Sequence, residues 1–378
     1  MELSDEEEFV RQTAREFARN EIEPVALEYE RSGTYPRDLI SEAAAVGLTA
    51  PSLPVEYGGS GFGPVGRAIV FDELHRADPG IAESITAATF GCGVIAENGS
   101  EEQARRYVEP AASGEIVTAT AMTEPRGGSD FANIQTTARR ESDEYVLDGD
   151  KVFITNGSVA DAIVVYARTS DVDPPHRGIS AFVLDADHDG IDRTKMDGYL
   201  GPSTVDLGQI FLNEVRVPAD ALIGKEDEGF YYAMETMNES RLEVAASAIG
   251  AARGALDRAT DYVRDRDAFD RKVADYQSVR HRIADLETRL EAARSLTYET
   301  ARKMENGTLE GRRKPSMAKL FASELCEEVA SEAIQLHGGY GVFDEYRVES
   351  FFRWTKATQI YDGTSAIMRD VIADDVIG

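Results

Sequence analysis

The chain has 378 residues, of which 42% are hydrophobic and 29% charged, and a chain of this length is expected to form two or three domains with a buried core. Its formal net charge of −29 argues against nucleic acid or an anionic membrane as a partner, because both bind basic surfaces. No run of about 18 apolar residues occurs, so no membrane-spanning helix is expected.

Residues 1–115 are predicted to form an all-α domain of a cytoplasmic protein. The acidic start, MELSDEEEFV, lacks the basic residues and the apolar core of a secretory signal. One helix is expected to begin after Pro36 and to end at Gly47, because proline and glycine mark helix starts and stops in this way. Another is expected to begin after Ser100, where Gln103 completes a capping box.

Residues 116–225 are predicted to form a β domain. The segment EYVLDGDKVFITNG predicts two strands joined by an Asp-Gly turn. The segments DAIVVYARTS, GISAFVLDA and VDLGQIFLNEVRVP are β-branched and aromatic runs bounded by Gly, Pro and Asp, which is typical of strands. The β domain is therefore inserted between two helical regions.

Residues 226–378 are predicted to form a helical bundle. A long helix without internal proline is expected first, over the region that begins MNESRLEVAAS. The next helix carries an apolar seam with the spacing of a four-helix bundle, formed by Val279, Ile283, Leu286, Leu290, Ala293 and Thr297. A third helix is expected to end at Gly338 and Gly339.

The two cysteines, Cys92 and Cys326, indicate reduced thiols rather than a structural framework. Neither lies in a CxxC motif or a Cys/His cluster, so the sequence predicts no disulfide framework, no zinc site and no other metal site. Reduced thiols agree with the expected location in the cytoplasm.

Four short stretches have the composition of ligand-binding loops, although each has a simpler explanation. The glycines of TATAMTEPRGGSD (118–130) would let backbone approach a ligand, but such loops also simply turn. KVFITNG (151–157) also fits a half-buried strand, RDRDAFDRKVADYQ (264–277) a solvated face with salt bridges, and QLHGGYG (335–341) a helix stop. No GxGxxG follows a strand and no GxxxxGKS/T occurs, so neither nucleotide-binding fingerprint is present.

Taken together, eight stretches resemble one family, the acyl-CoA dehydrogenases, which are flavoenzymes that desaturate acyl-CoA thioesters. They are PVEYGG, NGSEEQ, AMTEPRGGSD, KVFITNG, LIGKEDEGF, RDAFDRKV…Q, QLHGGYG and IYDGTS, in the family's order over nearly the whole chain. The resemblance implies an α+β multidomain subunit with an N-terminal all-α domain (1–115), a middle β-barrel-like domain (116–225) and a C-terminal four-helix bundle (226–378). It also implies FAD as cofactor, a homotetramer, and a role in fatty acid β-oxidation and lipid metabolism.

The resemblance also implies which residues bind FAD. Met122 and Thr123 would lie near the reactive edge of the flavin ring, with residues 153–155 on its other side. Arg266 and Gln277 would hold FAD from a neighbouring subunit. Phe153 stands where the family often has Trp, so the ring packing is expected to differ slightly. The implied cofactor-binding residues are Thr120, Met122, Thr123, Gly128, Ser129, Phe153, Ile154, Thr155, Arg266, Gln277, Gln335, Gly338, Gly339, Thr364 and Ala366.

For the substrate, the resemblance implies an acyl-CoA thioester. A carboxylate base would take a proton from Cα while a hydride leaves Cβ for flavin N5, and the electrons would pass to an electron-transferring flavoprotein. Hydrogen bonds to the thioester oxygen would stabilise the developing enolate in a dry pocket. The implied substrate-binding residues are Ser129, Met237, Asn238, Ser240, Arg241, Tyr361 and Gly363.

Taken alone, the Asp-Gly pair at residues 362–363 predicts a turn. Within the motif Tyr-Asp-Gly-Thr, Asp362 is expected to be the base. Much of the family has Glu at this place, so the arm here is one methylene, roughly 1.5 Å, shorter, and a misplacement of that size can cost about 10²-fold in rate. Some members carry the base just before an Arg on the first bundle helix. That place is Ser240 here, which cannot serve. Glu243 shares its helical face and is the alternative base, although a solvated surface position is favoured for Glu239 and Glu243.

Other functions stay open on this fold. If neither carboxylate is the base, the chain is a catalytically impaired homologue that binds flavin or acyl-CoA. A flavin oxidase or monooxygenase would use the same cofactor with O₂. In having Asp at the position of the base, the chain resembles those family members that are dehydrogenases of cyclic or branched acyl-CoAs. A flavin-bearing protein that binds DNA would need a basic surface, which the charge of −29 disfavours.

The balance of charged residues predicts a halophilic protein. The chain has 69 acidic residues, and only eight of its 40 basic residues are lysines. Screening by concentrated salt makes the self-repulsion of such a surface tolerable. An ordinary acidic enzyme is the alternative, which the shortage of lysine makes less favourable.

Overall fold

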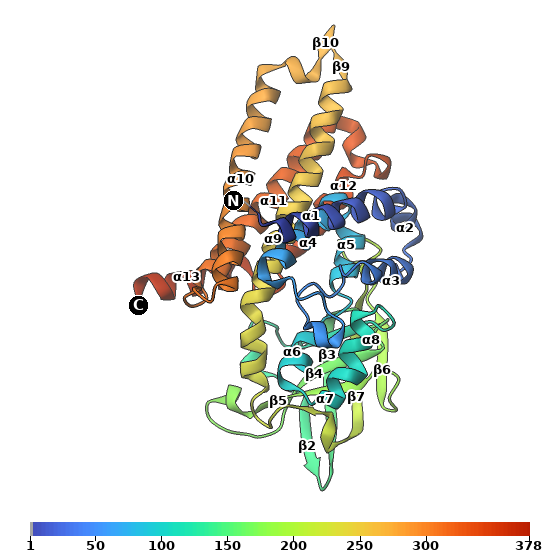
Figure 1. Ribbon diagram of the computed structural model, residues 1–378, viewed down its shortest axis with the longest axis vertical. Helices are drawn as coiled ribbons and strands as arrows, with labels where there is room; N and C mark the ends of the chain where they lie inside the picture. The colour runs from blue at the N-terminus through green and yellow to red at the C-terminus, as the bar shows by residue number, and fades with distance from the viewer. Residues whose placement is uncertain (1–2) are drawn as a thin grey trace.

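The computed structural model describes residues 3–378 and contains a helical, a β and a second helical region in chain order. Figure 1 shows the β sheet at one end of the long axis and the hairpin of β9 (Asp267–Ala268) and β10 (Arg271–Lys272) at the other, with helix α9 (Gly229–Asp265) extending between them. The predicted α+β architecture is confirmed.

The N-terminal region is helical as expected, and local sequence explains where several helices begin. A capping box of Ser4 with Glu7 starts the first helix, and the predicted box of Ser100 with Gln103 is confirmed. The predicted helix after Pro36 is also confirmed. The helices are α1 (Asp5–Phe17), α2 (Ala26–Ser32), α3 (Arg37–Ala45), α4 (Gly63–Ala77), α5 (Pro79–Thr86), α6 (Cys92–Asn98), α7 (Glu101–Gln103) and α8 (Glu109–Ala112).

The middle region is an eight-stranded sheet in the order β6–β7–β3–β2–β4–β5–β8, with β1 parallel to β4. One hydrophobic cluster consists only of residues from this region, including the fully buried Leu147 and Phe182, so the sheet encloses a core of its own. Within residues 3–378, the outer strands β6 and β8 do not pair with each other. The strands are β1 (Thr118–Ala121), β2 (Thr137–Glu141), β3 (Glu144–Thr155), β4 (Ala162–Arg168), β5 (Ile179–Asp185), β6 (Ile191–Lys195), β7 (Leu207–Pro218) and β8 (Leu222–Ile223).

The hairpin predicted for EYVLDGDKVFITNG is wrong, because the segment is the single strand β3. At the Asp-Gly pair the strand does not reverse but changes register against β7, between Leu147 and Gly149. Gly149 has φ +149°, and a Cβ atom there would lie 2.6 Å from Thr136 Oγ1. Gly149 therefore allows the segment at Thr136 to approach closely at a bulge, and it does not form a turn.

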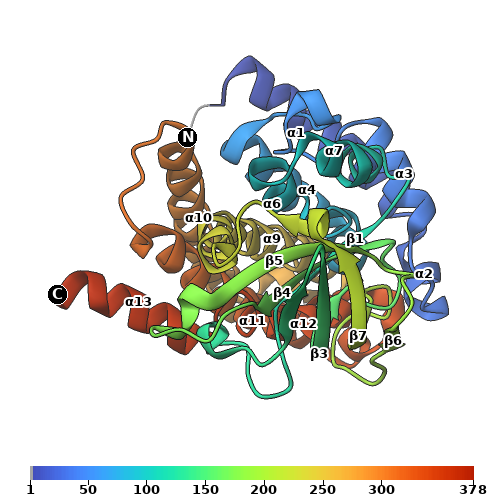
Figure 2. The same cartoon turned by 90° about the horizontal axis from the view of Figure 1, so that it is seen from below.

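The C-terminal region contains α9 and the helices α10 (Gln277–Glu305), α11 (Arg313–His337), α12 (Val348–Thr358) and α13 (Ser365–Ile377). The predicted seam of α10 is confirmed at Leu286, Leu290, Ala293 and Thr297, which are buried, whereas Val279 and Ile283 are half-buried. Helix α11 packs on α9, α10, α12 and α13. Figures 1 and 2 both show α13 projecting from the body of the molecule with the C-terminus at its tip.

Helix α4 is enclosed by other helices although its sequence is not uniformly apolar. It packs against α1, α5, α9 and α10, and 12 of its 15 residues are buried. The buried residues include Arg67, Asp72, Glu73 and His75. Polar and charged groups in such a position require partners, and here the partners come from helices distant in the sequence.

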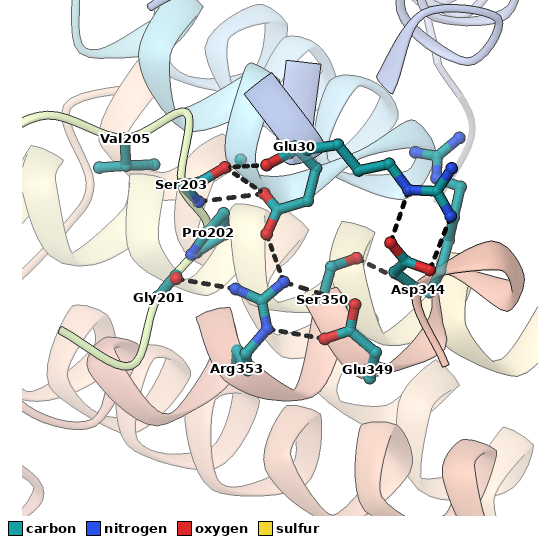
Figure 3. A network of polar contacts seen from close by, with 12 residues as sticks. Glu30, Gly201, Pro202, Ser203, Val205, Asp344, Glu349, Ser350 and Arg353 are labelled. Atoms are coloured by element: carbon teal, nitrogen blue, oxygen red, sulfur yellow. Dashed lines mark hydrogen bonds and ion pairs between the residues drawn. The ribbon is translucent and has the colours of Figure 1, made fainter. Parts of the chain in front are cut away.

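A polar network joins the three regions at one place (Figure 3). Arg353 of α12 pairs with Glu30 of α2 and with Glu349 on its own helix. The same guanidinium donates to the carbonyl oxygen of Gly201 at 2.8 Å, and the N–H of Ser203 donates to Glu30 at 3.0 Å. Burial lowers the pKa of Arg353, but the carboxylates outweigh burial and raise it overall. The loop at residues 201–203 is thus fixed to both helical regions.

Replacing Arg353 by Met tests this network. The change leaves Glu30 and Glu349 without their shared cation in a partly buried place, and we expect it to lower the free energy of unfolding by about 2 kcal/mol. Arg105→Met is the matched control, because Arg105 pairs with Glu101 and Glu109 on an exposed surface, and its loss should cost less than about 0.5 kcal/mol. Urea midpoints at one protein concentration measure both, and equal shifts would contradict the role of the network.

Candidate active site

A buried ion pair fixes two of the predicted FAD-binding stretches to each other. Lys151 of β3 has no exposed area, and its ammonium lies 2.9 Å from Glu124 Oε1 and donates to the carbonyl oxygen of Met122 at 3.2 Å. The N–H of Val152 donates to the carbonyl oxygen of Thr123 at 3.0 Å. Burial lowers the pKa of Lys151 to about 8, against the opposing effect of Glu124. The backbone of residues 122 and 123 is thereby held beside β3.

Phe153 points out of the sheet because β3 has a second irregularity there. The register against β7 shifts between Lys151 and Ile154, and Phe153 has φ +58°. Its ring is 62% exposed although Val152 and Ile154 on either side are buried. Bulges of this kind re-aim a side chain and are frequent beside active sites. The ring of Phe153 is therefore free to contact a ligand, whereas Ile154 can offer only its backbone.

The glycine-rich loop after β1 is open on its outer side. Gly128 and Ser129 are exposed, and a Cβ atom placed on Gly127 would meet nothing within 4 Å. Thr120 is half-buried, and a Cβ atom on Gly91 would lie 2.9 Å from its hydroxyl oxygen. The carbonyl oxygen of Thr123 accepts a hydrogen bond from Val152, so the loop begins beside the residue that precedes Phe153.

A separate pocket of about 450 Å³ brings together another group of predicted residues. Arg266, Gln335, Gly338 and Gly339 all line it, together with aromatic residues. A Cβ atom on Gly338 or Gly339 would meet nothing within 4 Å, so the backbone is open there, and the Arg266 guanidinium lies 5.6 Å from the ring centre of Tyr340. A cation, open backbone and aromatic rings suit phosphates and a purine. Gln277, the first residue of α10, does not line this pocket.

Within one chain, the pocket lies far from the residues predicted to face the flavin ring. Arg266 follows directly on α9 and precedes the β9–β10 hairpin, at the end of the long axis opposite the sheet (Figure 1). Thr123 and Phe153 belong to the sheet region. One chain therefore does not bring the two predicted groups of FAD-binding residues into a single site.

The motif Tyr-Asp-Gly-Thr forms the turn that joins α12 to α13. Asp362 has φ +51° and Gly363 has φ +94°, so the predicted Asp-Gly turn is confirmed. A Cβ atom on Gly363 would lie 2.6 Å from Met368 Cε. Thr364 caps α13 by accepting a hydrogen bond from the N–H of Ile367, while Ala366 is exposed. Local sequence thus places the Asp362 side chain at a sharply defined corner.

Charged groups from three helices surround the carboxyl of Asp362. Burial raises its pKa, and the nearby carboxylate of Glu83 on α5 raises it further. The Ser240 hydroxyl and the cations Lys319 and Arg241 oppose this rise. The net pKa lies above the ordinary value of an aspartate. Such a carboxyl is better matched to a weakly acidic proton than one exposed to water.

Several predicted substrate-binding residues carry polar atoms without partners. Arg241 is buried, yet its Nε and Nη1 atoms have no hydrogen-bond acceptor among residues 3–378. Asn238 Oδ1 has no hydrogen-bond donor among the same residues. Met237 and Tyr361 are half-buried. Buried polar atoms are almost always paired in proteins, so atoms left free beside Asp362 point to a polar ligand.

The expectation that Glu243 is solvated is wrong, because its side chain is mostly covered, whereas the Glu239 side chain keeps 39% of its surface exposed. Both pair with Arg67 of α4 at 2.8 Å, and the Arg67 side chain is only 10% exposed. Burial raises the pKa of Glu243, Arg67 opposes the rise, and the charge of Asp362 adds to it. Glu243 therefore lies near Asp362, but its carboxylate is already held by a buried arginine.

Four charged residues around these stretches were not expected from the sequence. They are Glu83, Glu124, Lys151 and Lys319. A signal did exist for the lysines, because the chain has only eight and these two stand among apolar residues of a strand and a helix. Burying an ionisable residue costs free energy unless its charge is paired. A lysine within an apolar run therefore indicates a position with a partner or a function.

Among residues 3–378, no group of three or more His, Cys, Asp or Glu side chains could hold a metal ion. In the same part of the chain, no helix combines the length and the apolar character needed to cross a membrane. Both cysteines are free and buried.

Comparison with known protein families covers almost the whole chain. Models of the N-terminal, middle and C-terminal domains of acyl-CoA dehydrogenase match residues 4–115, 119–215 and 227–377. An acyl-CoA dehydrogenase of Bacillus subtilis is 37% identical over the full length of both chains. A cyclohex-1-ene-1-carbonyl-CoA dehydrogenase of Geobacter metallireducens is 38% identical over 98% of this chain and 97% of the relative.

Solved structures agree with these relatives. A structure of the electron-transferring flavoprotein of Acidaminococcus fermentans, solved in a study of flavin-based electron bifurcation, matches with a TM-score of 0.95 and 36% identity over 100% of this chain and 99% of the other. A glutaryl-CoA dehydrogenase of Mycobacterium smegmatis in complex with FADH₂ matches with a TM-score of 0.93 and 26% identity over 99% and 95% of the two chains. FAD is the cofactor of this enzyme family. The chain is an oxidoreductase that belongs to the acyl-CoA dehydrogenase family.

Proposed function

We propose that this enzyme removes hydrogen from Cα and Cβ of an acyl-CoA thioester, with Asp362 as the base. The observation that carries the proposal is the corner at Asp362, where a carboxyl with a raised pKa lies beside Ser240 and the partner-free donors of Arg241. Glu243 is the weaker candidate, because Arg67 already occupies its carboxylate.

The residues present fit FAD, and two groups of them would hold it. The exposed ring of Phe153 and the fixed backbone at residues 122–123 suit a flavin ring, while Arg266 and the open backbone at Gly338 suit phosphates. When bound, FAD accepts the hydride that leaves Cβ. The two groups lie toward opposite ends of the long axis of one folded subunit (Figure 1). We therefore propose that a second copy of the chain completes each FAD site. A homotetramer would provide such copies.

The chain's own residues would then act on the α-proton. The Asp362 carboxylate takes this proton, and the corner holds its short arm in place. As the proton leaves, negative charge grows on the thioester oxygen, and the backbone N–H of Asp362 is the donor that we propose for it. Ser129, Asn238 and Arg241 would orient the thioester and its pantetheine chain. Exclusion of water by the acyl group strengthens each of these contacts.

We propose a compact cyclic or branched acyl group as substrate. The arm of Asp362 is short, so Cα must come close to the corner at residues 361–363. The polar surroundings of that corner, including Glu83, suit a long alkyl chain poorly. The relative from Geobacter metallireducens supports the proposal by its name as a dehydrogenase of a cyclic acyl-CoA. Faster flavin bleaching by cyclohex-1-ene-1-carbonyl-CoA than by butyryl-CoA would agree with it, and the reverse order would count against it.

For the electrons, we propose an electron-transferring flavoprotein as acceptor. The match to a structure from a study of such a flavoprotein supports this choice. We also propose a role in fatty acid β-oxidation, because that process desaturates acyl-CoA thioesters. We propose the cytoplasm as the location of the enzyme.

Removing the base tests the assignment directly. We expect Asp362→Asn to lower the rate of anaerobic flavin bleaching by about 10²- to 10⁴-fold while FAD stays bound, because the amide cannot accept the α-proton. Glu243→Gln is the matched variant and should keep the rate within about tenfold of the parent. Stopped-flow absorbance in the flavin band measures both, and a parental rate in Asp362→Asn would remove Asp362 from the mechanism.

The pH dependence of bleaching tests the raised pKa. The base acts only when ionised, so the rate should fall as the pH falls through the pKa of Asp362. Since burial raises that pKa, the midpoint should lie above the ordinary aspartate value of about 3.9. Stopped-flow reduction over a pH series checks this, with FAD content measured at each pH as the control. A rate that stays level down to the ordinary value would contradict the burial of the carboxylate.

We also propose that the enzyme is adapted to high salt. The net charge of −29 and the eight lysines support this. The free energy of unfolding should rise between about 0.1 M and about 2 M KCl, because screening removes repulsion among the carboxylates. A neutral osmolyte at equal osmolality is the control. Equal stability at both KCl concentrations would show an ordinary acidic enzyme.

A further inference from the structure

Lys319 of α11 makes an unexpected contact with the corner that carries Asp362. The side chain has no exposed area, and its ammonium donates to the carbonyl oxygen of Gly363 at 2.7 Å. Gly363 directly follows Asp362. Among the residues that the structure describes, this carbonyl is the one hydrogen-bond acceptor of Lys319.

We infer that Lys319 is a positioning residue for the base: its ammonium holds the corner through the Gly363 carbonyl and keeps the Asp362 carboxyl ionised. This inference rests on the proposed function, because it acts through Asp362. Lys319 itself would touch neither substrate nor flavin.

The burial of Lys319 supports this role. A lysine needs compensation when it is taken from water, and one neutral carbonyl is weak compensation for a full charge. The anion that stabilises the charged form of Lys319 is Asp362. Burial lowers the pKa of Lys319 to about 8, Asp362 opposes this, and the nearby cation Arg241 adds to it. Lysine and aspartate therefore stabilise each other's charged forms.

The backbone of the corner explains why an anchor is useful. Asp362 and Gly363 both have positive φ, and such conformations persist in a non-glycine residue only when neighbours enforce them. Thr364 fixes the corner from α13 through its helix cap, and Lys319 fixes it from α11. With a short arm, the position of the Asp362 backbone decides where the carboxylate reaches, and small displacements of reacting groups are costly.

Other charged groups face the same carboxyl and enter the test. Arg241 and Ser240 come from α9, and Glu83 comes from α5. Arg241 also favours the ionised carboxylate, so removal of Lys319 should weaken the ionised form without abolishing it. The carboxylates of Glu83 on α5 and Glu243 on α9 act in the opposite direction in parent and variants alike.

Three substitutions separate the charge of Lys319 from its hydrogen bond. Lys319→Gln keeps a donor and removes the charge, Lys319→Met removes both, and Lys319→Arg keeps both. Lys314→Gln is the matched control, because Lys314 lies on the same helix but pairs with Glu299 at the surface. All are measured as FAD-loaded protein, by stopped-flow flavin bleaching over a pH series and by FAD content.

We expect Lys319→Gln to raise the midpoint of the acid limb by about one pH unit, because a cation near the carboxyl is lost. Lys319→Met should show the same shift and also lower the plateau rate by about tenfold or more, because the corner is freed. Lys319→Arg should restore the limb, and Lys314→Gln should match the parent. Substrate affinity should change little in any of them.

A second readout needs no substrate. Infrared difference spectra against pH follow the carbonyl band of protonated Asp362, which is identified by its loss in Asp362→Asn. This band should appear at higher pH in Lys319→Gln than in the parent. If none of the acyl-CoAs bleaches the flavin of the parent enzyme, the proposed function is wrong. The infrared band of Asp362 would still report on the effect of Lys319.

Two results would overturn the inference about Lys319. The first is an acid limb and an infrared midpoint that are the same in parent and Lys319→Gln. The second is loss of FAD or of folded protein in all three variants, Lys319→Arg included, which would assign Lys319 a purely structural role.

Discussion

The burial of helix α4 on every side is the constraint on which the assembly of this enzyme depends. Asp72 has no exposed area and accepts a hydrogen bond from Tyr298 of α10 at 2.9 Å while pairing with Arg253 of α9. Glu73, its neighbour, pairs with Arg15 of α1 at 2.9 Å. Charges in an interior are tolerated only with partners, so these contacts set how three other helices lie against α4. The hydrophobic contacts around them supply most of the stabilisation.

The same constraint reaches the corner at Asp362. Arg67, also on α4, needs a carboxylate and takes those of Glu239 and Glu243. The pairing occupies Glu243, the glutamate considered as the alternative to Asp362 for the base. Among residues 3–378, Asp362 forms no ion pair, and its carboxyl is stabilised only by the Ser240 hydroxyl and by the more distant cations Lys319 and Arg241. Our preference for Asp362 as the proposed base thus follows from how the scaffold satisfies its own buried charges.

Local signals were reliable wherever the chain decides its conformation within a few residues. The capping box at Ser100, the start of α3 and the Asp-Gly corner at residues 362–363 were predicted and confirmed. The Asp-Gly pair at residues 148–149 was predicted as a turn and is a bulge in β3, because Thr136, the residue before β2, approaches Gly149 closely. Identical dipeptides therefore differ in outcome when a neighbouring strand competes with the turn. Lys319 escaped prediction since its acceptor lies 44 residues away.

By itself, the sequence determined which residue types are present and the family to which they point. It also favoured the left-handed corner at Asp362, because Asp and Gly tolerate positive φ better than most other residues, and contacts from α11 and α13 then hold that corner. The tertiary structure alone decided which carboxylate is free, since Arg67 and Glu243 are 176 residues apart. It also decided the direction of each pKa, because burial and charge partners exist only after distant helices pack. The local sequence thus specifies which chemical groups the site contains, and the tertiary structure specifies how strongly the pKa of each group is shifted.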